Sequence, residues 1–136
     1  CEAGGADSLW QTDRLVEPIL ECMAVMAALA GRTRRMKFGM NDVSIALRDP
    51  GFVATQCATV DVLSDGRLLP AFGGGSPAGP ENGARSGHAH AGTRDRREVG
   101  DRAASLGEDN VDFRGVHYRL SGVSISPKPV QTDLPM

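Results

Sequence analysis

The sequence predicts an α/β protein in which parallel β-strands alternate with α-helices. In the first half of the chain, short apolar segments of strand type alternate with longer segments whose apolar residues recur at helical spacing. The connections between them are only a few residues long, as in βαβ units, whose right-handed crossovers place helices over the sheet. After residue 110 the pattern changes to the alternation of apolar and polar residues that is typical of a small hairpin.

The composition fits one globular domain and argues against several classes of partner. The 136 residues are 40% hydrophobic and 24% charged, which argues against a wholly disordered chain. A net charge of −2 gives no general attraction to nucleic acid or anionic membranes, and the longest apolar run, 19–30, is interrupted by Glu21. We therefore expect neither a nucleic-acid nor a membrane partner.

Cysteine usage and the chain ends add two further expectations. Three cysteines without a CxxC pair, and no secretory leader, indicate reduced thiols in a cytoplasmic protein, two of them on apolar helix faces. Both ends of the sequence look cut, the start inside an expected helix and the end just where another element could begin. We therefore expect it to be a fragment of a longer protein.

The first strand and helix are expected from DSLWQTD (7–13) and from the segment over 17–33. Leu9 and Trp10 are the apolar residues of a short buried strand. The helix is expected to have Pro18 in its first turn and to end at Gly31. Its apolar face is formed by Ile19, Cys22, Met23, Met26, Leu29 and Ala30.

The second strand and helix follow over 34–45 and from Asp49 to Gly66. The strand pattern is less regular because Asn41 and Asp42 interrupt it. Asp49 caps the helix, the proline after it suits the first turn, and Gly66 ends it. The apolar positions along this helix are Phe52, Val53, Cys57, Val60 and Leu63.

A third strand is expected from RLLPAFGGG (67–75), although Pro70 cannot donate a hydrogen bond to a sheet ladder. We expect Trp10, Phe38 and Phe72 to lie on three neighbouring parallel strands. The expected organisation is therefore a βαβαβ unit over 1–77, an irregular segment over 78–107, and a hairpin with an extended Pro-rich connector over 108–136.

Six stretches in this order resemble the bacterial luciferase-like monooxygenase family, whose members are flavin-dependent and F420-dependent oxidoreductases on a TIM barrel. The stretches are GADSLWQTDR, AALAGRTRRMKFG, LRDP, ATVDVLSDGRL, GGGSP and DFRGVHYRLSGVSISPKPVQ. The resemblance implies a partial TIM (β/α)8 barrel, with parallel strands two to four, their helices and a small hairpin before strand five. A whole barrel of this type needs about 250 residues. The resemblance also implies FMN or F420 as cofactor and a small organic substrate.

The resemblance places candidate cofactor-binding residues at the carboxyl ends of the strands, where the catalytic loops of such barrels lie. Two glycines would let a flat ring approach the backbone closely, and an asparagine would offer its amide to the ring or the substrate. Some family members also have a non-proline cis peptide near the end of strand three. The candidates are Asp13, Gly39, Met40, Asn41, Gly73 and Gly75.

Each of these candidates has a structural alternative. Asp13 could cap the next helix, Asn41 could be a turn residue, and the Gly-rich segment could be a plain flexible turn without the lysine of a P-loop. Asp42 departs from the family, which usually has an apolar residue there, and a buried unpaired carboxylate would be costly. Neither a catalytic base nor a nucleophile is assigned.

The segment 83–107 matches neither the family nor the patterns on either side of it. His88 and His90 lack further metal ligands, so no metal is expected, and the arginines are interleaved with acidic residues as in a solvated run. With GC-rich codons, the reading frame one base along can encode an amphipathic helix that ends in Leu-Trp, as the family helix here does. We interpret the segment as translated out of frame between two compensating base shifts, which resequencing of the encoding DNA would test.

Two classes of function remain open from the sequence. The first is a fragment of a luciferase-like flavin- or F420-dependent oxidoreductase or monooxygenase. The second is a non-catalytic α/β remnant without cofactor, whose unpaired sheet edges would favour association between copies of the chain, a homo-oligomer.

Overall fold

The computed structural model describes residues 1–14, 18–45, 48–73, 108–114, 119–132 and 134. Their elements, in chain order, are η1 (Glu2–Gly4), β1 (Ser8–Gln11), α1 (Cys22–Arg32), β2 (Lys37–Met40), β3 (Val43–Ser44), α2 (Pro50–Ser64), β4 (Leu68–Leu69), β5 (Phe72–Gly73), β6 (Val111–Arg114) and β7 (Arg119–Val123). Among the described helices, none is long and apolar enough to cross a membrane. The irregular segment expected over 78–107 lies outside the described residues, so its interpretation as an out-of-frame translation stays a prediction.

The strands of the first half are parallel, as the sequence predicts. The order β1-β2-β4 forms one sheet and β3-β5 a second, and all three of these pairings are parallel. Leu9 is paired with Phe38 and Phe38 with Leu68, so the expectation that Trp10 and Phe38 lie on neighbouring parallel strands is confirmed. It is wrong for Phe72, which lies in the second sheet and is paired with Val43.

The division into two sheets follows from breaks in two of the chain segments. One break lies at Asn41 and Asp42, which stand between β2 and β3. The other is at Pro70, which lacks the N–H that a continuous ladder requires. The Val43 N–H donates to the Ala71 carbonyl at 2.8 Å, so the two broken segments stay in register beyond their breaks.

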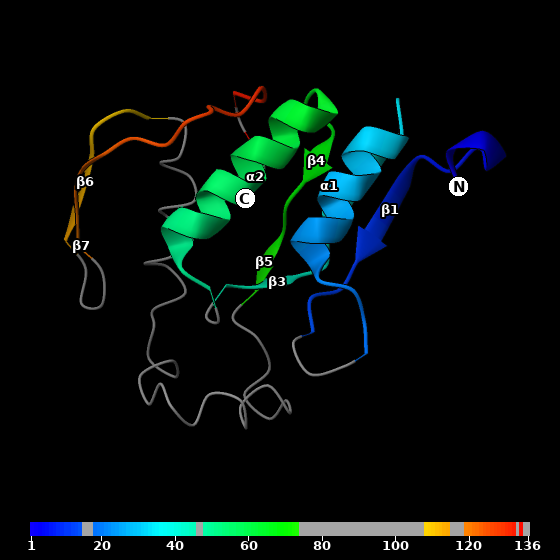
Figure 1. The fold of residues 1–136 in the computed structure, drawn as a ribbon, viewed down its shortest axis with the longest axis horizontal. Helices are drawn as coiled ribbons and strands as arrows, with labels where there is room; N and C mark the ends of the chain where they lie inside the picture. The colour runs from blue at the N-terminus through cyan, green and yellow to red at the C-terminus, as the bar shows by residue number, and fades with distance from the viewer. Residues whose placement is uncertain (15–17, 46–47, 74–107, 115–118, 133, 135–136) are drawn as a thin grey trace.

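Both helices pack against one face of the sheet, side by side (Figure 1). The side chains that fill the space between helices and strands are fully or almost fully buried. They are Cys22, Met23, Met26, Ala30, Phe38, Met40, Val43, Ile45, Val53, Cys57, Val60 and Leu68. The expected apolar faces of the two helices are thus confirmed at Met23, Met26, Val53, Cys57 and Val60, and the methionines fill the core.

The first helix begins later and ends later than the sequence predicts. Glu21 is its N-cap, with its carboxylate accepting from the Ala24 N–H at 2.8 Å, so Pro18 precedes the helix and Ile19 is exposed. Gly31 lies inside the last turn and Thr33 is the C-cap. A carboxylate that satisfies free N–H groups at the helix start outweighs the preference of proline for a first turn.

The second helix follows the sequence more closely. Asp49 caps it by accepting from the Phe52 N–H, and Pro50 stands in the first turn. At the other end, Asp65 and Gly66 both have positive φ, and the Gly66 N–H donates to the Asp61 carbonyl. Two apolar expectations are wrong at this helix, because Phe52 and Leu63 are 70% and 59% exposed.

The opposite face of the sheet is left open by the described residues. Trp10 is 49% exposed, so the expectation of a buried first strand is wrong for this residue. Its ring lies over Gly39, where an added Cβ would be 2.7 Å from the ring and would overlap the Leu69 carbonyl oxygen. Glycine is therefore required at this position by the close approach of β4 and of the indole.

The hairpin expected after residue 110 is present. β6 and β7 are antiparallel, with Val111 opposite Val123, and the hairpin lies at the α2 end of the molecule in Figure 1, with β1 at the other end. The expected turn at Gly115, with His117 and Tyr118, lies outside the described residues. The described residues of the connector after β7 lie in neither helix nor strand and include a cis Ser126–Pro127 bond.

Glu2 fastens the start of the chain to the loop between α1 and β2. Its carboxylate accepts the backbone N–H groups of Arg34, Arg35 and Met36, at 2.9, 2.5 and 3.1 Å. The bond from Arg34 lowers the pKa of Glu2 most, and those from Arg35 and Met36 add to this against a smaller opposing effect of burial. A carboxyl whose pKa is lower in the folded chain stabilises it above the ordinary glutamate pKa, and this contribution is lost as the pH falls through the lowered value.

We therefore expect Glu2→Gln to reduce the difference in stability between neutral and acid pH. Urea unfolding of both proteins across this range measures the effect. The wild type should lose its advantage over the variant as the pH falls, and a constant difference at every pH would contradict the assignment. The same acid-to-amide change at the exposed Asp7, whose carboxylate makes no hydrogen bond among the described residues, serves as the control.

Candidate functional site

The site lies where the strands end and the helices begin. In a parallel sheet with helices on one face, the carboxyl ends of the strands and the amino ends of the helices share one edge of the fold. The described residues after β1, β2 and β3, the end of β5, and the first residues of α1 and α2 meet at this edge (Figure 1).

Asp13, a predicted site residue, lies just after β1 and forms an ion pair with Arg48. Asp13 Oδ1 is 2.8 Å from Arg48 Nη2, and Asp13 Oδ2 accepts from Arg48 Nε at 3.3 Å and from the Ser44 N–H at 3.1 Å. The side chains of Asp13 and Arg48 are only 6% and 18% exposed. The alternative that Asp13 caps the following helix is wrong, because Glu21 does so.

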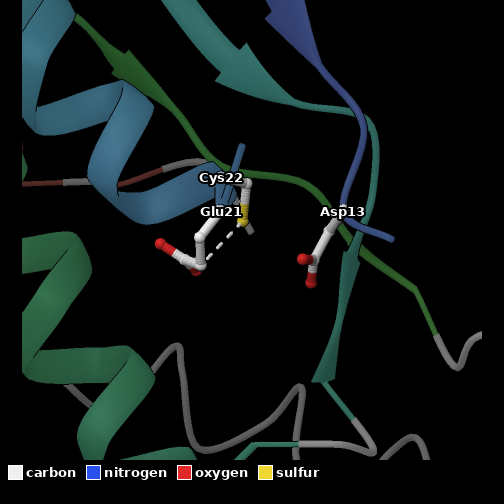
Figure 2. Close-up of side chains that lie close together, drawn as sticks. All are labelled: Asp13, Glu21 and Cys22. Atoms are coloured by element: carbon white, nitrogen blue, oxygen red, sulfur yellow. Dashed lines mark hydrogen bonds between the residues drawn. The ribbon is translucent and has the colours of Figure 1, made fainter. Parts of the chain in front are cut away.

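Glu21 and Cys22 complete this cluster (Figure 2). Glu21 Oε1 is 2.9 Å from Arg48 Nη2, so one guanidinium group bridges two carboxylates. Figure 2 shows the side chains of Asp13, Glu21 and Cys22 around a common space, with their ligand atoms within 4.8 Å of one another. Arg48 Nη2 also lies 3.6 Å from Cys22 Sγ.

The protonation states follow from burial and from these contacts. Burial, together with the negative charge of Asp13, raises the pKa of the Cys22 thiol to about 12. Partial burial works to raise the pKa of Glu21, but the N–H groups of Ala24 and Met23 and the pairing with Arg48 lower it overall. Burial alone would lower the pKa of Arg48, and the hydrogen bonds and charge of Asp13 reverse this and raise it.

This chemistry does not favour a metal ion or a reactive thiol in the cluster. The Arg48 guanidinium already supplies the positive charge that the two carboxylates require. A thiol with a pKa near 12 stays protonated at neutral pH, and the thiolate is the form that binds metals or attacks electrophiles. Cys57 is buried in the core with its pKa likewise raised to about 12 by burial, and Cys1 is exposed; all three are free thiols, as predicted.

Asn41 and Asp42 lie beside this cluster, at the end of β2. Both side chains are exposed, so the expected cost of a buried carboxylate at Asp42 does not arise. The cis bond between them stands where the resemblance implied one. The Asp42 carboxylate lies over the α-carbon of Gly73, where it occupies the space that a Cβ would take.

The other predicted site residues are placed differently. Met40 is completely buried among the helices, and Gly39 is covered by Trp10. Their assignment as cofactor-binding residues, like that of Asp13, Asn41 and Gly73, stays a prediction. Gly75 lies outside the described residues.

A groove of about 690 Å³ lies along the two helices. It runs between α1, α2 and the end of the hairpin, and its lining includes Met23, Phe52 and Ile125. None of Asn41, Asp42 and Gly73 lines it, but Glu21 and Asp49, the caps of the two helices, do. The groove therefore shares Glu21 with the cluster and lies apart from the Asn41–Asp42 peptide.

Comparison with known proteins decides the family. The sequence profile described as luciferase-like monooxygenase matches residues 1–136, the whole chain. The chain belongs to the luciferase-like monooxygenase family. The F420-dependent glucose-6-phosphate dehydrogenase of Amycolatopsis mediterranei (strain U-32) is 30% identical over 148 aligned positions, which cover 96% of this chain and 42% of that enzyme.

Solved structures of luciferase-like enzymes share the fold. The monooxygenase RslO1 from Streptomyces bottropensis superposes with a TM-score of 0.81 at 24% identity, over 96% of this chain and 40% of its own. A type II Baeyer-Villiger monooxygenase from Pseudomonas putida, solved in complex with FMN, gives 0.80 at 18% identity, over 98% of this chain and 41% of its own. The parallel strands and helices described above are thus part of a TIM barrel, and the chain spans about two fifths of the length of each relative named here.

Sequence reasoning found one member of the luciferase-like chain's ion-pair cluster and missed the others. Asp13 is a candidate from the sequence, whereas Glu21 stands out there only as an interruption of an apolar run and Cys22 only as part of an apolar helix face. Arg48 stood in the LRDP stretch that carried the family resemblance, and a single arginine next to a helix cap was the available signal. No pattern along the chain pairs it with Asp13, because 35 positions separate the two.

Proposed function

We propose that this chain forms part of the cofactor- and substrate-lining edge of a flavin- or F420-dependent oxidoreductase or monooxygenase that acts on a small organic substrate. The observation that carries the proposal is the exposed Asn41–Asp42 peptide at the strand ends, flanked by Gly73 and backed by an ion-pair cluster. Relatives of both cofactor types support it, since one is F420-dependent and another was solved with FMN.

The residues at this edge fit one face of a flat ring. The Asn41 carboxamide is exposed and offers both donors and an acceptor, while its backbone N–H is held by the Gln11 carbonyl at 2.8 Å. Among the described residues, the nearest atoms to the Cβ space of Gly73 belong to the exposed Asp42 side chain, whose end can turn away. Met40 and Phe38 support the strand from the core side.

This arrangement implies separate roles for the protein and for the cofactor. A bound flavin or F420 would supply the redox chemistry. The chain's own residues would orient the ring through Asn41 and the backbone at Asn41–Asp42, and would limit the access of water on the side that the strands cover. Groups that bind the cofactor phosphate are expected on the later strands of a barrel.

The proposal is tested by titrating the purified chain with FMN and with F420 and following the quenching of cofactor fluorescence. We expect saturable binding of one of the two. Asn41→Ala should weaken it about tenfold, the equivalent of about 1.4 kcal/mol and typical of one lost hydrogen bond.

A matched control is Gln56→Ala, which removes a carboxamide from the groove side of α2 and should leave the affinity unchanged. If neither cofactor binds, or if the two variants weaken binding equally, the proposed role of this edge is wrong. Absence of binding together with self-association in sedimentation would instead favour the non-catalytic remnant with open sheet edges.

A further inference from the structure

We propose that Arg48 is a positioning residue, which acts through Asp13 to hold the Asn41–Ser44 segment in place at the strand ends. The importance of that segment for cofactor binding rests on the proposed function. The positioning itself is a property of the folded chain and can be measured without any cofactor.

The first step is the connectivity of the ion pair. Arg48 stands between β3 and the cap of α2, and its own N–H donates to the Ile45 carbonyl at 3.1 Å. Its side chain reaches back to Asp13 after β1 and to Glu21 before α1. One guanidinium group therefore joins three loops of the same edge, in a geometry that the planar fork of arginine allows and a lysine ammonium cannot reproduce.

The second step is what Asp13 holds. Three N–H groups of the Asn41–Ser44 segment have partners: Asn41 donates to the Gln11 carbonyl and Val43 to the Ala71 carbonyl. The third, Ser44, donates to the Asp13 carboxylate. Ser44 is thus the position where the segment depends on a side chain rather than on a neighbouring strand.

The third step is why Asp13 needs Arg48. A carboxylate that is only 6% exposed is far from water, and without a partner its charge would be uncompensated. The same carboxylate would then turn toward solvent, and this change weakens its bond to the Ser44 N–H. Arg48 consequently keeps the Asp13 carboxylate aimed at β3.

Loss of the Asp13–Arg48 ion pair and loss of the Glu21–Arg48 ion pair should have different effects. The Asp13 side chain is buried and accepts a hydrogen bond from the backbone of β3, whereas the Glu21 side chain is 47% exposed and accepts one from the start of α1. Exposed ion pairs contribute little to the stability of the fold. Loss of the Glu21–Arg48 pair should therefore loosen the start of α1 and leave the Asn41–Ser44 segment almost unchanged.

Amide hydrogen exchange of the intact chain tests the inference. In Arg48→Met and Asp13→Asn we expect the Ser44 amide to exchange at least about tenfold faster relative to the Phe38 amide, which donates to the Arg67 carbonyl. Asn41 and Val43 should follow in the same direction. Arg48→Lys should give an intermediate result, and Glu21→Gln should alter Ala24 instead.

Glu2→Gln is the matched control, because it removes a carboxylate that also accepts backbone N–H groups, but at the other edge of the sheet. It should speed exchange at Arg34, Arg35 and Met36 and leave Ser44 unchanged. A uniform increase at all amides in Arg48→Met would show a general stabilising role and overturn the proposal, as would an unchanged Ser44.

The cofactor titration adds a second readout that separates the two proposals. If the wild type binds FMN or F420, Arg48→Met and Asp13→Asn should weaken binding and Glu2→Gln should not. If the wild type binds neither, the proposed function fails while the exchange data still decide the role of Arg48.

Discussion

Replacing Arg67 with methionine should lower the free energy of unfolding by about 4 kcal/mol, because the guanidinium group satisfies carbonyls at the ends of both helices. Its nitrogens donate to the carbonyls of Ala30, Thr33, Met36 and Ser64 and to the Thr33 hydroxyl, at 2.6 to 3.1 Å. The group also lies over the Phe38 ring, 5.3 Å from its centroid. Methionine keeps most of the apolar stem and removes every donor.

Urea unfolding followed by circular dichroism measures this loss. Arg67→Lys should recover only part of it, since one ammonium cannot reach acceptors spread around a planar fork. Arg32→Met is the control, because Arg32 is exposed in the last turn of α1, and such surface changes stay within about 0.5 kcal/mol. Equal effects of Arg67→Met and Arg32→Met would contradict the role assigned to Arg67.

Sequence reasoning predicts the fold well where the physical signal is local. Alternating strand and helix patterns, the Asp49–Pro50 helix start and the Asp65–Gly66 helix end all depend on residues close together in the chain, and all are found. The start of α1 was misplaced because Pro18 and Glu21 both carry start signals, and only the folded chain shows which N–H groups need a partner. The exposure of Trp10 depends on which strands flank β1, which no local pattern reports.

The sequence predicts on which edge of the sheet the site lies, but it does not predict which side chains are in contact there. Parallel strands place their carboxyl ends together, so Asp13, Asn41 and Gly73 could be assigned to one region before the structure was known. The pairing of Asp13 with Arg48 depends on the path of two loops, and the contact of Asp42 with Gly73 depends on the break in β2. Such contacts join positions that are distant along the chain and leave no periodic signature.

Replacing Asp61 with asparagine should cost about 3 kcal/mol and release the connector that follows the hairpin. Asp61 is completely buried in α2, and its Oδ2 accepts from the backbone N–H groups of Val130 and Gln131, at 2.8 and 3.0 Å. Its Oδ1 accepts from Gln131 Nε2 at 2.7 Å, and the same amide donates to the Leu68 carbonyl. A carboxamide keeps one acceptor oxygen and turns an NH₂ group toward donors.

The PKPVQ stretch, which carried part of the family resemblance, is thus held against the barrel by one buried carboxylate. Limited proteolysis of the connector with elastase and urea unfolding should both report its loss in Asp61→Asn, with cleavage after Val130 appearing before global unfolding. Asp65→Asn makes the same chemical change at an exposed position with φ of 55°, which asparagine tolerates, and should leave both measurements near the wild type. The role of Asp61 is wrong if the connector is as resistant to cleavage in Asp61→Asn as in Asp65→Asn. In that case contacts other than the Asp61 carboxylate hold the connector, and the hairpin is fixed in place through its own strands.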